Sequence, residues 1–137
     1  MTASIATRTL TELDHARVSR LLSRPESRPP SADSMAEILD FSEVVPSPAV
    51  PPTVVTMNSQ VRLKDARSGV ESELTLSYPN EADAASGRVS VLSPMGFAVL
   101  GLSVGDLASW RGPTGEEGAA VIVSVLYQPE AAGDYLL

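Results

Sequence analysis

The spacing of hydrophobic residues changes from a helical period to a strand period after about fifty residues. Thr11 can cap a first helix because its hydroxyl can accept a hydrogen bond from an amide of the first turn, and Pro25 ends it. A second helix is predicted from Ser31 or Asp33 to about Val44. The two apolar sides consist of Leu10, Leu13, Val18, Leu21 and Leu22 in the first helix, and of Met35, Ile38, Leu39, Phe41 and Val45 in the second. Because a loop of roughly ten residues joins them, the helices are expected to pair as a short antiparallel hairpin.

A proline-rich stretch follows, Pro46-Ser47-Pro48-Ala49-Val50-Pro51-Pro52, which is expected to be extended and semi-rigid. Beyond it, alternation of apolar and polar residues predicts strands at 61–64, 73–78, 88–92, 107–111 and 119–127, with a hairpin turn at 66–69. The predicted fold class is therefore α+β, with an N-terminal helical hairpin followed by an antiparallel sheet and one short helix. The predicted organisation is a helical hairpin at 1–45, a linker at 46–53 and a second domain at 54–137.

The one short helix is predicted within the segment from Ser93 to Asp106. Ser93 can cap it and Pro94 suits the first helical position, where a missing N–H costs nothing. Gly101 can end it with a positive φ. We interpret Gly96, Gly101 and Gly105 as turn and close-packing glycines, because their spacing fits no phosphate-binding loop. Core packing is expected for Phe97 and Leu100.

The pattern Ser-Pro-x-Gly-x-Ala-hydrophobic-Leu-Gly-x-x-Val-Gly-Asp at 93–106 resembles the C-terminal, FKBP-like domain of the Gre transcript-cleavage factors. With the sequences at 54–59 and 127–137, the chain also resembles the family of regulators of nucleoside diphosphate kinase. This resemblance implies an FKBP-like sheet domain that binds the rim of the secondary channel on the largest RNA polymerase subunit. The implied contact loop consists of Leu92, Ser93, Pro94 and Met95, with Leu92 at a position where the cleavage factors often have Asp or Asn.

The tip of the helical hairpin departs from that family. By resemblance, the cleavage factors pass a long coiled coil through the secondary channel, and two carboxylates at its tip help to hold a second Mg²⁺ that activates water. The corresponding region here contains Arg24, Glu26, Arg28 and Asp33, with Glu26 between two arginines and Asp33 expected as a helix cap. Each helix is only about 20 Å long at 1.5 Å per residue. We therefore expect no transcript cleavage.

Composition narrows the classes of function that remain for this chain. The net charge is −7 and neither half is basic, so direct binding of DNA is not expected. The chain has no cysteine and a single histidine, His15, and we expect neither a cofactor nor a metal site. No signal sequence and no membrane span are apparent, and a cytoplasmic location is expected.

Three hypotheses remain. The first is a non-enzymatic transcription regulator that binds RNA polymerase near the secondary-channel rim and competes with Gre factors. The second is a regulator of nucleoside diphosphate kinase level or activity, acting through an acidic surface that includes Glu71, Glu73, Glu116 and Glu117. The third is a residual enzyme, either a prolyl isomerase or a cleavage factor; it is disfavoured because the sequence offers few aromatic residues for a proline pocket and no paired tip carboxylates.

Overall fold

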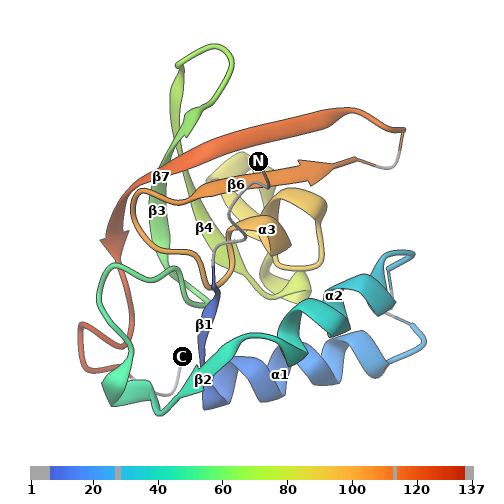
Figure 1. Ribbon diagram of the computed structural model, residues 1–137, viewed down its shortest axis with the longest axis vertical. Coiled ribbons are helices and arrows are strands. Elements are labelled where there is room, and N and C mark those ends of the chain that lie inside the picture. Colours follow the sequence, from blue (N-terminus) through green and yellow to red (C-terminus); the bar gives the residue numbers. More distant parts are fainter. Residues whose placement is uncertain (1–6, 27–28, 113, 135–137) are drawn as a thin grey trace.

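The computed structural model describes residues 7–26, 29–112 and 114–134 and has two parts stacked on each other (Figure 1). Two helices, α1 (Glu12–Ser23) and α2 (Ala32–Asp40), form the lower part. A twisted five-stranded sheet forms the upper part, and the short helix α3 (Pro94–Val99) lies within its curve. The sheet has the order β5-β4-β3-β7-β6, with strands β3 (Gln60–Asp65), β4 (Glu71–Ser77), β5 (Arg88–Ser90), β6 (Leu107–Arg111) and β7 (Glu117–Tyr127).

Helix α1 begins where the sequence predicts, because the Asp14 amide donates a hydrogen bond of 3.0 Å to the Thr11 hydroxyl. Helix α2 is shorter than predicted, since it ends at Asp40 and not near Val44. The residues after it form strand β2 (Glu43–Val45), which pairs in parallel with β1 (Thr9–Thr11). Phe41, expected on the apolar side of the second helix, is 80% exposed. Backbone pairing with β1 therefore takes precedence over the helical pattern of this segment.

The sheet is mixed, and its prediction as antiparallel is wrong at one strand. Strand β5 pairs in parallel with β4, with Leu76 opposite Val89. The connection between them makes two short 3-10 turns, at Pro79–Glu81 and Ala84–Ser86, and this length allows the chain to return in the same direction. The other neighbouring strands are antiparallel. The hairpin turn predicted at 66–69 is confirmed, with Asp65 accepting the amide hydrogens of Arg67 and Ser68.

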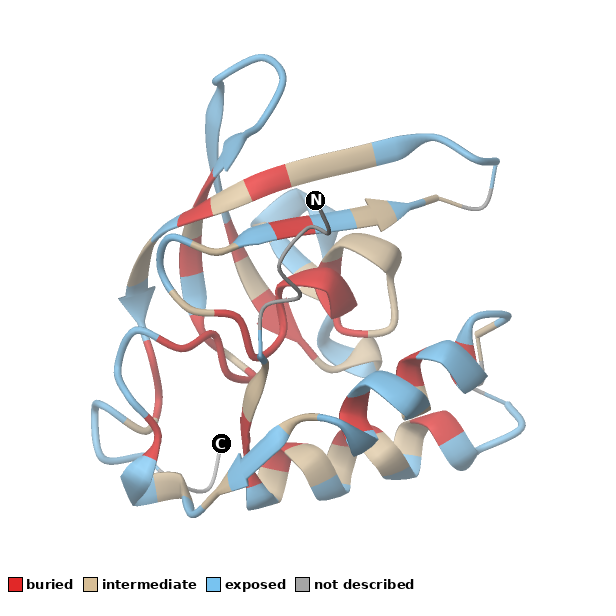
Figure 2. Ribbon diagram, viewed as in Figure 1, coloured by how far each residue is buried: buried red, intermediate tan, exposed pale blue. Residues whose placement is uncertain are grey.

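One hydrophobic cluster joins the two parts, and its buried positions line the space between and within them (Figure 2). The helices contribute Val18, Leu22, Ala32, Met35 and Leu39, and the sheet and α3 contribute residues such as Val61, Leu76, Phe97, Val99 and Ile122. The proline-rich segment between them contains a 3-10 turn, Ser47–Ala49, where an extended chain was expected. Within the described residues, no helix is both long and apolar enough to cross a membrane.

The N-terminal segment is fastened to helix α3 by Arg8. Its Nη1 donates hydrogen bonds to the carbonyl oxygens of Phe97, at 2.6 Å, and Leu100, at 3.0 Å. Its guanidinium carbon lies 5.1 Å from the centre of the Phe97 ring. The Thr9 amide donates to the Gly101 carbonyl at 3.0 Å. Arg8 thus satisfies carbonyls at the end of a helix, which is a favourable place for a cation.

We expect Arg8→Met to lower the free energy of unfolding by about 2 to 4 kcal/mol, because two carbonyls lose charge-assisted hydrogen bonds. Arg67→Met is the matched control, since Arg67 is exposed in the β3–β4 turn and should change stability by less than about 0.5 kcal/mol. Urea unfolding of both variants measures the difference. Equal stabilities would show that Arg8 does not fasten the N-terminal segment.

Candidate functional site

Residues 92–95 form the corner between strand β5 and helix α3. The Ser93 hydroxyl accepts a hydrogen bond of 3.1 Å from the Gly96 amide and donates one of 2.6 Å to the Ser90 carbonyl. Pro94 occupies the first helical position. The interpretation of Ser93 as a helix cap is confirmed. The Ser93 hydroxyl acts as both donor and acceptor within the corner, and these two hydrogen bonds restrict the motion of its backbone.

Glycines at 96 and 101 have the packing and turn roles that the sequence indicates. A Cβ at Gly96 would lie 2.0 Å from the Ser90 carbonyl oxygen, so a side chain cannot be accommodated here without displacing backbone. Gly101 has a φ of 80° and follows the end of α3. These two positions set the tight path of the chain through the corner.

The side chains of the corner are divided between surface and core. Leu92, Ser93, Pro94 and Met95 are all partly exposed, whereas Phe97 and Leu100 are buried, as expected. Leu92 and Met95 also pack against the hydrophobic cluster. The four predicted contact residues are therefore accessible to a partner and supported from beneath. Their role in binding stays a prediction.

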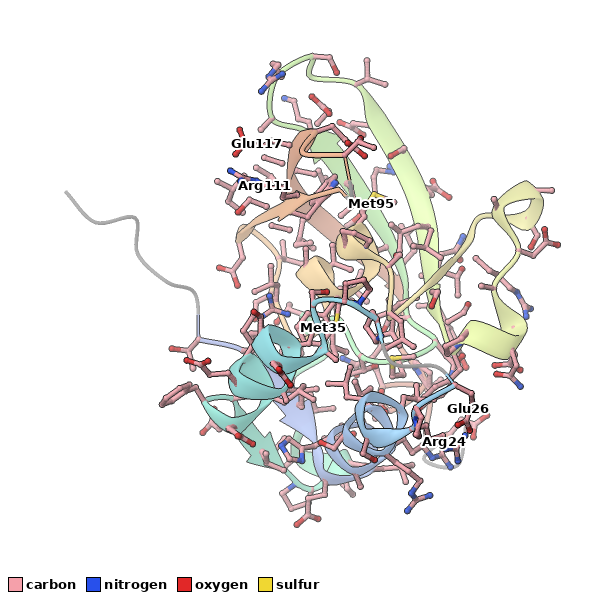
Figure 3. All side chains as sticks on the ribbon, turned by 90° about the vertical axis from the view of Figure 1, so that its right-hand side faces the viewer. Arg24, Glu26, Met35, Met95, Arg111 and Glu117 are labelled. Atoms are coloured by element: carbon pink, nitrogen blue, oxygen red, sulfur yellow. The ribbon has the colours of Figure 1, made fainter. Side chains whose placement is uncertain are left out.

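The predicted tip residues lie at the far end of α1 and the start of α2. Arg24 and Glu26 are exposed and are seen together beyond the end of α1 (Figure 3). Asp33 is not the helix cap: Ser31 holds that position and Asp33 lies in the first turn of α2. Its carboxylate there is favourably placed near the positive end of the helix. Arg28 lies outside the described residues.

The helices are too short to extend far from the body. With 12 residues in α1 and 9 in α2, they span about 18 Å and 14 Å at 1.5 Å per residue. Among the described residues, no group of three or more His, Asp or Glu side chains is arranged to hold a metal ion. The tip and the corner are separate regions, with Met95 on the body and Arg24 and Glu26 well below it in Figure 3.

A buried polar cluster, which the sequence analysis did not identify, joins α1 to the body. The Asp14 side chain is 2% exposed, and its Oδ2 accepts a hydrogen bond of 3.0 Å from the Met57 amide. Next to it, the Thr56 hydroxyl donates to Glu130 Oε1 at 2.7 Å and lies 2.9 Å from the Ser59 hydroxyl. The sequence did contain a signal: Asp14 lies four and eight residues before the buried Val18 and Leu22, which places it on the inner face of α1.

Burial raises the pKa of the Asp14 carboxyl to about 7, and the nearby Glu130 adds to the rise. The hydrogen bonds from Met57 and Thr11 and the charge of Arg17 act in the opposite direction. The Asp14 carboxyl therefore titrates near neutral pH at the contact between α1 and the body.

Comparison with known proteins identifies a family and several relatives that this chain resembles. The family model described as transcription elongation factor, GreA/GreB, C-terminal, matches residues 50–127. The regulator of nucleoside diphosphate kinase of Escherichia coli K12 is 38% identical over 129 residues, covering 93% of this chain and 95% of that protein. Transcription elongation factor GreA of Christiangramia forsetii is 35% identical over 81 residues, and the match spans 51% of it.

A solved structure agrees over nearly the full length. The prokaryotic transcription elongation factor GreA/GreB from Nitrosomonas europaea superposes with a TM-score of 0.73 and 38% identity. The match covers 90% of this chain and all of that one. The mixed α+β arrangement of helices and curled sheet is therefore shared with a GreA/GreB protein.

The raised pKa of Asp14 predicts that stability falls as the pH rises. Between the ordinary value of 3.8 and about 7, the folded chain binds more protons at this group than the unfolded chain. The free energy of unfolding should therefore decrease from pH 4 to pH 7, with a limiting slope of about 1.4 kcal/mol per pH unit from this group, and level off above it.

The variant Asp14→Asn tests this, because its amide keeps an acceptor for Met57 and does not titrate. We expect the pH dependence between 4 and 7 to flatten and the variant to be the more stable protein at pH 8. Asp40→Asn, at an exposed position of α2, is the control and should keep the wild-type profile. Urea unfolding at several pH values gives the measurement, and an unchanged slope in Asp14→Asn would contradict the assignment.

Proposed function

This chain belongs to the family of regulators of nucleoside diphosphate kinase and, by residues 50–127, to the GreA/GreB C-terminal family, and from this we propose that it is a non-enzymatic regulator of transcription. It binds RNA polymerase near the rim of the secondary channel, on the largest subunit, and competes there with Gre-type factors. It does not stimulate transcript cleavage. Its place of action is the cytoplasm.

The observation that carries this proposal is the short length of α1 and α2 together with the exposed tip. Helices of about 18 Å and 14 Å bring Arg24 and Glu26 only a short way from the body. Glu26 stands without a neighbouring tip carboxylate in the chain order Arg24-Pro25-Glu26. Holding a second catalytic Mg²⁺ requires helices long enough to reach the polymerase active centre and paired carboxylates at their tip. We therefore propose that the chain occupies the channel rim without stimulating transcript cleavage.

The grip on the polymerase is assigned to the FKBP-like part of the chain. We propose the division into an N-terminal helical hairpin at 1–45, a linker at 46–53 and an FKBP-like domain at 54–137. The contact loop is the corner formed by Leu92, Ser93, Pro94 and Met95. Its partly exposed side chains and its rigid hydrogen-bonded backbone support this assignment, because a preformed loop loses little conformational freedom on binding.

An enzymatic role has less support. The relatives are named as regulators and elongation factors. Ser93 uses its hydroxyl to cap α3 and is not paired with a general base. Phe97 is buried in the core and does not line an open pocket for proline. Neither nucleophilic catalysis nor prolyl isomerisation is proposed.

Binding to core RNA polymerase, measured by fluorescence anisotropy with a Gre factor as competitor, tests the proposal. We expect a complex at micromolar concentration that the Gre factor displaces. Pro94→Glu should weaken the complex at least tenfold, since a charge is placed in the contact while the first helical position tolerates Glu. Stalled complexes incubated with the chain should release no cleaved transcript.

Pro48→Glu is the matched control. Pro48 is exposed in the 3-10 turn Ser47–Ala49, so the same substitution is made in a short helix elsewhere on the surface. It should leave the affinity for polymerase unchanged. The proposal fails if no complex forms at micromolar concentration, and the corner is not the contact if both variants bind as the wild type does.

The second candidate is regulation of nucleoside diphosphate kinase by direct protein contact. The name of the Escherichia coli relative, identical at 38% of positions, favours it. The acidic surface suggested for this role is partly neutralised, however, because Glu73 and Glu71 lie within 4.0 Å of Arg62 and Glu117 lies 2.9 Å from Arg111. Glu116 is hydrogen-bonded to Thr114.

A kinase assay with purified components separates the two candidates. We expect nucleoside diphosphate kinase turnover to stay unchanged when the chain is added in excess, because any effect on the enzyme is proposed to act through transcription. A change in turnover that saturates with the added chain would support direct regulation. Glu71→Gln combined with Glu73→Gln would then be expected to reduce that change.

A further inference from the structure

Two adjoining cavities lie between helix α1 and the chain that follows strand β4. The first, of about 510 Å³, is lined by Arg17, Arg20 and Arg24 together with Tyr78 and Asn80. The second, of about 490 Å³, shares Arg17, Tyr78 and Asn80 and adds Arg88 of β5. The two cavities adjoin at these three residues, and together they are called here the arginine groove. Its arginines are Arg17, Arg20, Arg24 and Arg88.

The fold, and not a run of sequence, assembles this groove. Arg17 and Arg20 are three residues apart on one face of α1, and Arg24 is the residue that ends the helix. Arg88 comes from the opposite wall, where the parallel pairing of β5 with β4 sets it beside Thr75. The charge totals of the two halves of the chain conceal this convergence.

The groove is basic in an acidic protein. The net charge is −7, yet four of the ten basic residues line these two cavities. Elsewhere, Arg62 and Arg111 form ion pairs with glutamates, and Arg8 donates hydrogen bonds to backbone carbonyls. In the described part of the chain, Arg20, Arg24 and Arg88 form no ion pair.

Stabilisation of the helix does not account for the arrangement. Cations in the last turn of a helix contribute about 0.3 to 1 kcal/mol, which explains Arg20 and Arg24 but not Arg17 or Arg88. The guanidinium of Arg17 lies over the Tyr78 ring, 5.9 Å from its centre, and is held between the two cavities. Glu81 is an acidic residue of the lining of the second cavity. The charge of Arg17 also interacts with the Asp14 carboxyl.

Arginine side chains that line adjoining cavities are suited to phosphate, since each planar guanidinium fork can pair with two oxygens at once. The amide side chains of Asn58 and Asn80 can add further hydrogen bonds. Because its arginines are spread over two adjoining cavities, the groove suits an extended anion better than a single compact one. We infer that the arginine groove binds a di- or triphosphate group, carried by a nucleotide or present as inorganic polyphosphate.

This site is distinct from the corner at Leu92–Met95, and its test requires no polymerase. Isothermal titration calorimetry of the full chain with sodium tripolyphosphate, ATP and adenosine is the experiment. We expect tripolyphosphate and ATP to bind and adenosine not to bind. The affinity should fall as salt is raised, because the contacts are between charges.

Arg20→Gln combined with Arg88→Gln should lower the affinity for tripolyphosphate at least tenfold. Both positions are exposed, so the variant is expected to fold, which circular dichroism and thermal unfolding check. Arg67→Gln is the matched control, because it removes an exposed arginine outside the groove. It should bind tripolyphosphate as the wild type does.

Equal affinity for ATP and tripolyphosphate would assign recognition to the phosphates, and tighter ATP binding would point to a nucleotide as the source; both support the site. Three results overturn it: no binding of either at millimolar concentration, equal losses in the double variant and in Arg67→Gln, or displacement of tripolyphosphate by a short single-stranded RNA at far lower concentration. The last would identify a nucleic-acid surface.

Discussion

The attachment of the N-terminal region to the sheet depends on two titratable side chains that cross the contact, the partly buried Arg8 and the buried Asp14. Removing an ionised group from water is costly unless the protein supplies hydrogen bonds in its place. Arg8 donates hydrogen bonds to the carbonyls at the end of α3, and Asp14 accepts one from the Met57 amide. Because both sets of hydrogen bonds have defined geometry, these groups favour one position for α1 on the body. Apolar packing alone is less selective, since it rewards many similar arrangements.

This attachment also decides where the two exposed regions of the molecule stand. The Ser93 cap lies at the start of α3, and the hydrogen bond from Arg8 to Leu100 lies at its end. The short helix therefore connects the corner to the N-terminal segment that precedes α1. A partner that holds the corner would therefore hold a body from which α1 projects in a fixed direction. The short helices then limit how far Glu26 extends from the body, so the distance between the corner and the tip is set by the whole fold.

Sequence reasoning succeeded where the signal was local. The Thr11 and Ser93 caps, the turn at 66–69 and the packing of Gly96 each depend on residues within a few positions of one another. It failed where a distant partner decided the outcome. The segment at 41–45 has a helical apolar pattern, but its residues 43–45 pair with β1, and β5 runs parallel because of the length of its connection. Among the site residues, Asp14 gains its surroundings only when α1 lies against Met57 and Glu130, and Arg88 gains its place only when β5 pairs with β4.

The same contact joins the titrating group to the basic groove. Arg17 lies on α1 between them, lining the groove while its charge acts on the Asp14 carboxyl. When Asp14 loses its proton, a carboxylate appears close to Arg17 and competes with an anion in the groove for that guanidinium. An anion in the groove, in turn, contacts arginines of both α1 and β5 and so favours the attached position of α1. Proton binding at Asp14 and anion binding at the groove are therefore positively coupled: each raises the affinity for the other.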